Sequence, residues 1–133
     1  MSQENIEIVK RAITAINERD VAAYLAICTS DFELINPIAA IEGSNRGEPG
    51  IRAFFDSIRE GATKFELEIE RMEALDDDRV LAWLTLEVES TGGFPHRQPL
   101  TNLYELKDGK LSRVRVFFDR EEALEAAGLP AGN

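Results

Sequence analysis

Apolar residues before Gly61 recur at three- and four-residue spacing, which is typical of helices that bury one face. Residues 4–19 show this stripe most clearly. A second stripe covers residues 21–28 and follows Asp20, whose carboxylate can accept hydrogen bonds from the free amides at a helix start. The stripe of residues 51–58 ends before Gly61, a residue type that favours helix ends. The first half of the chain is therefore predicted to be mainly helical.

After Gly61 apolar and polar residues alternate, which is typical of strands with one buried face. The alternation that begins at Phe65 has reversed its parity by Met72, so we expect a β-bulge near Arg71. The predicted strands are short stretches bounded by turn residues. They cover residues 32–36, 65–74, 80–90, 100–106 and 111–118.

The turns between these strands are short, so neighbouring strands are expected to pair as hairpins. Asp108 and Gly109 form the clearest reversal, because Asp-Gly suits a tight two-residue turn. Residues 119–128 are predicted to form a last helix, with Asp119 and Glu122 at the spacing of a capping box. Consecutive hairpins after a helical half indicate an α+β fold with a curved antiparallel sheet and helices packed on one side. We expect residues 1–133 to form a single domain.

Composition narrows the classes of partner. The net charge of −10 would repel nucleic acid and anionic lipid surfaces, which need clustered Lys and Arg. No apolar run approaches the roughly 20 residues of a membrane span, and the start of the sequence lacks the apolar region of a signal peptide. A cytoplasmic protein without nucleic-acid or membrane partners is therefore expected. The single histidine and single cysteine, His96 and Cys28, provide no ligand cluster, so no metal site is predicted.

Two stretches carry a resemblance to a known family. The segment Arg46 to Phe55 reads RGEPGIRAFF, and the end of the chain runs from Asp108-Gly109-Lys110 to Phe117-Phe118-Asp119. With the order of elements, they resemble the SnoaL-like branch of the superfamily of nuclear transport factor 2 and ketosteroid isomerase. The resemblance implies a cone-shaped, cystatin-like α+β fold, a pocket for a small molecule, a homodimer, and chemistry without metal or organic cofactor.

Ketosteroid isomerases resemble the chain closely enough to align by hand. In that alignment the family's oxyanion tyrosine falls on Ala12, its general-base aspartate on Asn36, and its proton-donating aspartic acid on Thr101. An alanine donates no hydrogen bond, and a neutral amide does not abstract a proton from carbon. Steroid isomerisation by that mechanism is therefore not expected.

SnoaL-like cyclases place their base at the end of the last strand, nine residues before a glycine that ends the terminal helix. Asp119 and Gly128 have that spacing, so the resemblance implies Asp119 as a candidate general base. The alternative is a structural role, in which Asp119 only caps the terminal helix. His96 could also transfer protons, because an unperturbed imidazole has a pKa of about 6.5, or it could lie exposed in a loop between strands.

The remaining candidates would contact a ligand rather than react with it. Asn36 could orient a carbonyl or a water, and Arg115 shares the parity of Phe117 and Asp119, so the three point to one side of a strand. That side faces either the pocket or solvent. Aromatic residues such as Tyr104 could line the pocket or belong to the core. The predicted ligand-binding residues are Asn36, Tyr24, Trp83, Thr101, Arg115 and Phe117.

Three functions remain open on this evidence: an isomerase, cyclase or lyase acting on a small apolar or polyketide-like compound, a non-catalytic ligand binder, or a dimerisation module. A pocket with a facing acid or base would favour the enzyme, and an apolar pocket without one would favour the binder.

Overall fold

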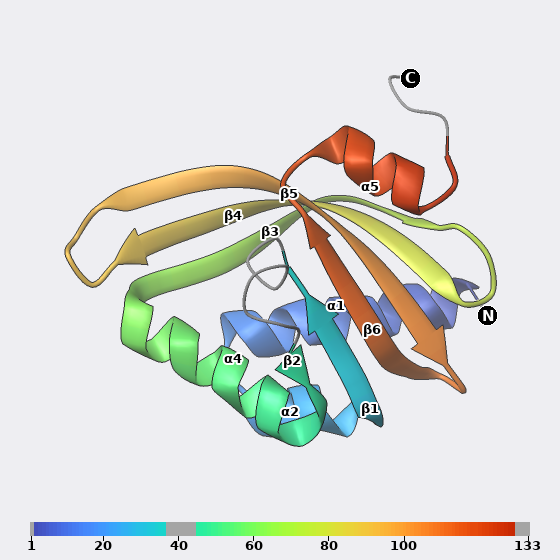
Figure 1. Cartoon of the computed structure of the whole chain (residues 1–133), viewed down its shortest axis with the longest axis horizontal. Coiled ribbons are helices and arrows are strands. Elements are labelled where there is room, and N and C mark those ends of the chain that lie inside the picture. The colour runs from blue at the N-terminus through green and yellow to red at the C-terminus, as the bar shows by residue number, and fades with distance from the viewer. Residues whose placement is uncertain (1, 37–44, 130–133) are drawn as a thin grey trace.

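The computed structural model describes residues 2–36 and 45–129. Helices from the first half of the chain lie on one face of a twisted sheet, and the last helix crosses the other face (Figure 1). The described helices are α1 (Ser2–Asn17), α2 (Val21–Ala26), α4 (Gly47–Gly61) and α5 (Arg120–Ala126). The described strands are β1 (Cys28–Ile35), β2 (Asn45–Arg46), β3 (Ala62–Ala74), β4 (Arg79–Ser90), β5 (Pro95–Lys107) and β6 (Lys110–Phe117).

The six strands of the described part form one sheet in the order β2-β1-β6-β5-β4-β3. Strands β3 to β6 follow one another as antiparallel hairpins, as the sequence predicts. Strand β1 instead pairs with β6 in parallel. That pairing joins strands that are distant along the chain, so it could not be predicted from a local sequence pattern. It makes the sheet mixed and not purely antiparallel.

Two predicted boundaries are corrected by the strand pairing. Cys28, predicted within the second helix, is the first residue of β1 and lies opposite Leu111 of β6. His96, predicted in a loop, lies in β5 opposite Val88, because β5 begins at Pro95 and pairs along almost all of β4. The polar residues at the start of β5 hide the apolar alternation that would have marked it as a strand.

Two predicted irregularities are confirmed. The register of β3 against β4 shifts between Ile69 and Arg71, which is the bulge expected near Arg71. Asp108 and Gly109 have φ angles of 51° and 77°, the left-handed pair that a two-residue hairpin turn requires.

The sheet has a core on each face. The larger core lies on the concave face, where residues such as Val9, Phe55 and Val114 pack α1, α2 and α4 against the strands. The smaller core lies on the convex face, where Leu124 of α5 packs with Leu81 and Leu103. Because α5 lies on the opposite face from the other described helices, residues of one strand serve two different cores according to their parity.

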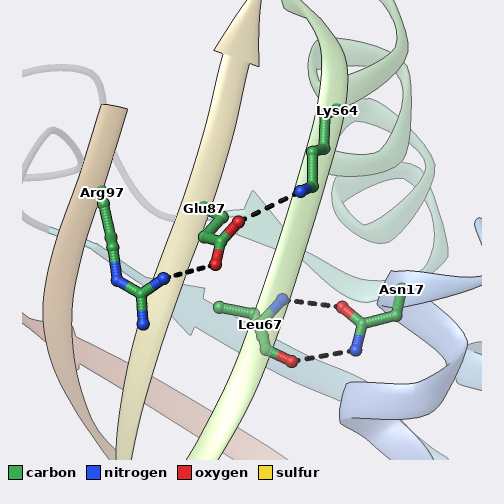
Figure 2. Close-up of polar contacts among 5 residues, drawn as sticks. All are labelled: Asn17, Lys64, Leu67, Glu87 and Arg97. Atoms are coloured by element: carbon green, nitrogen blue, oxygen red, sulfur yellow. Dashed lines mark hydrogen bonds and ion pairs between the residues drawn. The ribbon is translucent and has the colours of Figure 1, made fainter. Parts of the chain in front are cut away.

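The end of α1 is fastened to β3, the last strand of the sheet. The side-chain amide of Asn17 donates to the carbonyl of Leu67 at 2.9 Å and accepts from its N–H at 2.8 Å (Figure 2). Arg19, which adopts a positive φ of 57°, donates to the carbonyl of Phe65 at 2.9 Å. These bonds hold the α1–α2 junction over the part of β3 that carries Phe65 and Leu67.

A row of charges crosses three strands on the convex face. Glu87 of β4 accepts from Lys64 of β3 at 3.0 Å and from Arg97 of β5 at 2.6 Å (Figure 2). Its pKa is lowered, first by the hydrogen bond from Lys64. All three side chains are solvent-accessible, so the row contributes little stability and mainly keeps this end of the hairpin polar.

The start of α4 explains one glycine of the RGEPGIRAFF segment. A Cβ added to Gly50 would lie 2.6 Å from the carbonyl carbon of Asn45, so only glycine fits there. The Asn45 side chain in turn donates to the carbonyl of Gly50 at 3.1 Å. This contact ties β2 to the first turn of α4.

None of the helices in the described residues is long and apolar enough to cross a membrane.

Candidate functional site

A cavity of about 190 Å³ lies between the concave face of the sheet and the helices α1, α2 and α4. The helices α1, α2 and α4 and five strands of the sheet contribute to its wall. Most of the wall is apolar. The lining residues are Ile16, Tyr24, Leu34, Asn36, Phe54, Phe65, Leu67, Leu86, Leu100, Asn102, Tyr104, Val114, Val116 and Phe118.

Aromatic packing fixes the helical side of this cavity. The ring of Tyr24 meets the rings of Phe32 and Phe55 edge-to-face, with centroids 5.7 and 5.5 Å apart, and Phe54 meets Phe55 in the same way at 5.8 Å. Edge-to-face contacts of this kind are favourable beyond the area that they bury. Tyr24 and Phe54 are therefore held in place as parts of the wall.

Polar groups on β5 form the most distinctive part of the wall. Asn102 and Tyr104 are two residues apart on the strand, so both side chains lie on the concave face. The side-chain amide of Asn102 donates to the Tyr104 hydroxyl at 3.1 Å. The other amide atom, Oδ1, is buried and has no hydrogen-bond partner within the described structure. A buried acceptor without a partner costs free energy, about 1–3 kcal/mol, unless something binds it.

Burial keeps the hydroxyl groups of this wall neutral. It raises the pKa of Tyr104 to about 12, although the hydrogen bond from Asn102 opposes that shift. Burial also raises the pKa of Tyr24 well above its ordinary value, with smaller contributions from Cys28 and Tyr104. Both tyrosines therefore act as hydrogen-bonding groups at neutral pH and not as bases.

Among the described lining residues there is no carboxylate, imidazole, amine or guanidinium. Within the same described part of the chain, no group of three His, Cys, Asp or Glu side chains could hold a metal ion. The described wall offers apolar surface and a few hydrogen-bonding groups.

The structure separates the predicted ligand-binding residues into two groups. Tyr24 and Asn36 line the cavity. The other four lie on the convex face, because they share the parity of Leu103 and not that of Asn102. This second group consists of Trp83, Thr101, Arg115 and Phe117.

The convex group packs mainly against protein. Trp83 and Phe117 belong to the small core under α5. The guanidinium of Arg71 lies 4.6 Å from the centre of the Trp83 ring, and that of Arg115 lies 5.4 Å from the centre of the Phe117 ring. A ligand-binding role for these residues stays a prediction, and it would require a ligand on the convex face.

Asp119 follows Phe118, the last residue of the cavity wall, and is itself exposed. Its carboxylate accepts from the backbone N–H of Glu121 at 2.9 Å, which makes Asp119 the cap of α5. The bond goes to the second helical residue and not to Glu122, and no hydrogen bond from the Glu122 side chain back to Asp119 is present in the described residues, so Asp119 caps α5 without the predicted capping box. The role of Asp119 as a general base stays a prediction.

His96 lies on the concave face but away from the cavity, at the exposed end of β5. Its Nε2 is 2.9 Å from the side-chain oxygen of Gln98. Predictions for Pro37 and for the first part of the loop 42–49 lie outside the described residues.

Asn102 is not among the residues predicted from the sequence. The sequence did hold a signal for it. Asn102 lies on the same face of the strand as Leu100 and Tyr104, and an amide side chain between two large side chains is unusual in a core. The alignment with ketosteroid isomerases pointed one residue earlier, to Thr101, which lies on the convex face. A shift of one residue along a strand exchanges the two faces of the sheet.

Larger grooves lie on the surface of the molecule. One of about 760 Å³ runs beside the start of α1 and two hairpin turns, and exposed charged side chains such as Glu7, Arg11 and Asp77 line it. Such an open, charged groove keeps little water away from a ligand. The smaller cavity has a mostly apolar wall with a few polar groups, which is the usual character of a small-molecule site.

Comparison with known proteins agrees with this architecture. A family model described as a SnoaL-like domain matches residues 9–114. No curated protein matches the chain at a significant level. The fold is the α+β fold of nuclear transport factor 2, as the sequence predicts, with N-terminal helices on a mostly antiparallel sheet.

Solved structures with this fold include complexes with small molecules. A Catenulispora acidiphila protein of ketosteroid isomerase-like fold, in complex with trimethylamine, is 17% identical, with a TM-score of 0.75 over 93% of this chain and 94% of that chain. A Mycobacterium tuberculosis protein in complex with estradiol-17beta-hemisuccinate is 17% identical, with a TM-score of 0.76 over 88% and 95%. An epoxide hydrolase from M. tuberculosis is 22% identical, with a TM-score of 0.74 over 89% and 84%.

Proposed function

Because the chain belongs to the SnoaL-like domain family, we propose that it binds a small, largely apolar molecule in the cavity between its helices and the concave face of its sheet. The observation that carries this proposal is the composition of the wall. Apolar side chains form most of it, and four polar residues, Tyr24, Asn36, Asn102 and Tyr104, are among the lining residues. Two proteins of the same fold hold small molecules, which supports the proposal by analogy.

The size of the cavity sets the size of the ligand. An apolar cavity of about 150 Å³ admits benzene, so about 190 Å³ suits a compound built on one aromatic ring. An aromatic ring buries roughly 150–250 Å², which corresponds to roughly 4–6 kcal/mol of transfer free energy. Part of that free energy is lost to immobilisation of the ligand. Simple one-ring probes are therefore expected to bind with dissociation constants near the millimolar range.

Titration with toluene, followed by two-dimensional NMR of the ¹⁵N-labelled protein, tests the proposal. The amide signals of cavity residues should shift in a saturable way. Leu86→Trp places a large ring in the cavity and should abolish the shifts. Thr85→Trp is the matched control, because Thr85 is the next residue of β4 and faces the convex side. Equal binding by both variants, or no saturable shift in the wild type, would refute the cavity as a binding site.

A second candidate is an enzyme that uses Asp119 as a general base. The match to the SnoaL-like domain family supports it by analogy, and in this chain Asp119 is exposed and lies outside the described cavity wall. A base would not survive Asp119→Asn, because an amide has no basic lone pair at neutral pH, and the rate would fall by ~10²–10⁴. Once a substrate is in hand, turnover by Asp119→Asn at the wild-type rate would leave Asp119 with a structural role only.

We further propose that the chain forms a homodimer through the convex face of the sheet. Trp83 packs at the border of the small core under α5, and its side chain remains only half-buried in the described structure. A partner surface would bury the part of the Trp83 ring that stays accessible.

A further inference from the structure

We propose that a surface groove between α2, α4 and the start of β3 binds a small organic acid, and that Arg19 holds its carboxylate with two parallel hydrogen bonds. The groove has a volume of about 420 Å³ and lies where α4 leads into β3 (Figure 1). Among the described residues it shares no lining residue with the cavity. A ligand there would be a second one, independent of the ligand of the cavity.

The groove is rich in positive charge on a chain that is acidic overall. Three arginines, Arg19, Arg52 and Arg59, line it together with one carboxylate, that of Asp56. The whole chain, in contrast, has 25 acidic and only 15 basic residues. Clustered guanidinium groups in a groove attract an anion even where the net charge of the molecule is unfavourable to it.

Carboxylates of α4 already balance two of these arginines. Arg52 pairs with a glutamate one turn before it at 2.9 Å, and Arg59 pairs with Asp56 at 2.8 Å. Arg19 has no carboxylate partner among the described residues, because the neighbouring Asp20 accepts from a backbone N–H at 3.0 Å as the cap of α2. The charge of the groove that remains unmatched is therefore that of Arg19.

The unpaired edge of the Arg19 guanidinium matches a carboxylate in shape. Its Nη1 donates to the carbonyls of Ile16 and Phe65, both at 2.9 Å, which uses both Nη1 protons. Nε and Nη2 make no hydrogen bond within the described residues, and Arg19 is exposed, so a ligand in the groove can reach it. These two nitrogens form one edge of the planar group, and their parallel N–H bonds fit the two oxygens of a carboxylate.

Contacts within the protein hold this guanidinium in place before any ligand binds. The two hydrogen bonds of Nη1 fix one side of it, and the group also lies over the Phe65 ring, 5.8 Å from the ring centre. Much of the side-chain entropy that an arginine normally loses on binding has therefore been lost already on folding.

The rest of the wall favours an acid with an apolar body. Val21, Phe55 and Ala62 also line the groove. A ring or a short alkyl group buries apolar surface against such residues, and inorganic phosphate cannot do so. The groove, at about 420 Å³, has room for a one-ring acid such as benzoate.

Benzoate and benzamide test this proposal, because they differ in charge and hardly in shape. NMR titration of the ¹⁵N-labelled protein gives both dissociation constants for the wild type, for Arg19→Gln and for Arg97→Gln. Arg97 is the matched control, since it is an exposed arginine that pairs with Glu87 at 2.6 Å and does not line the groove. We expect the wild type to prefer benzoate about fivefold, and this preference to disappear in Arg19→Gln and to persist in Arg97→Gln.

Equal affinity of the wild type for the two compounds, or the same loss of preference in both arginine variants, would overturn the proposal. If Arg19→Gln does not fold, the wild type still decides: benzoate should shift the side-chain Nε–H signal of Arg19, and benzamide should not.

Leu86→Trp, which fills the cavity, separates the two sites. Benzoate should bind this variant as it binds the wild type. Loss of benzoate binding in Leu86→Trp would place the acid in the cavity and overturn the assignment to Arg19. Failure of toluene to bind the wild type, in contrast, would refute the proposed function and leave the groove as an acid-binding site.

Discussion

Three groups with hydroxyl or thiol protons are buried close to one another under the helices. Tyr24 and Tyr104 line the cavity, and Cys28 lies beside Tyr24 at the start of β1. Burial raises the pKa of all three, to about 12 for Cys28 and Tyr104. The folded state therefore holds these protons more tightly than the unfolded chain does.

Stability is accordingly expected to fall in alkali. The contribution of Tyr104 is fully present below pH 10, its ordinary pKa, and is lost as the pH rises towards about 12, because the unfolded chain gives up the proton first. A shift of two pKa units corresponds to about 2–3 kcal/mol of unfolding free energy for this residue. Urea denaturation at pH 8 and at pH 11 measures the loss. Tyr104→Phe should show a smaller loss, and an identical loss in wild type and variant would contradict this account.

Residue-level prediction from the sequence succeeded where the element alone decides the direction of a side chain. Tyr24 belongs to a helix with one apolar stripe, and that stripe has to face the sheet. Arg115 and Phe117 were correctly placed on one side of a strand, but the sequence does not say which face the helices cover. Both faces of this sheet carry a core, so hydrophobicity could not distinguish the face of Asn102 from the face of Thr101.

At the scale of elements, α5 is the piece most dependent on a few contacts. It spans Arg120–Ala126, begins at the Asp119 cap and is anchored to the convex face by Leu124. A helix this short gains little from its own backbone and depends on its cap and its packing.

Asp119→Ala is therefore expected to lower the free energy of unfolding by about 1 kcal/mol, because the N–H of Glu121 loses its acceptor. Asp119→Asn should cost less, since asparagine and aspartate cap helices about equally well. Chemical denaturation of the three proteins gives the comparison. A loss as large for Asn as for Ala would mean that the carboxylate does more than cap the helix.

The order and type of most elements followed from periodicity and turn chemistry alone. The bulge near Arg71 and the Asp108-Gly109 turn were predictable because each depends on adjacent residues. The parallel pairing of β1 with β6 and the two-residue strand β2 depend on contacts between distant segments. Those contacts depend on how the whole sheet packs, so they cannot be predicted from a short stretch of sequence.

At the scale of the whole molecule, the proposed homodimer is the first property to measure. Light scattering at high micromolar concentration should give twice the chain mass of 14.9 kDa. The physical reason is the side chain of Trp83, which packs beside α5 but stays half-buried. A mass near 14.9 kDa would show that the convex face is satisfied within one chain.

The two hydrogen bonds between Asn17 and Leu67 have a consequence for how copies of the chain avoid one another. An outermost strand normally offers its free N–H and carbonyl groups to any extended peptide, and this is how sheets grow into aggregates. On β3 the Asn17 amide occupies both groups of Leu67, and Arg19 occupies the carbonyl of Phe65. An incoming strand would have to displace both side chains before it could pair there. The contacts that fasten the α1–α2 junction to β3 therefore also make this margin of the sheet a poor template for β-aggregation.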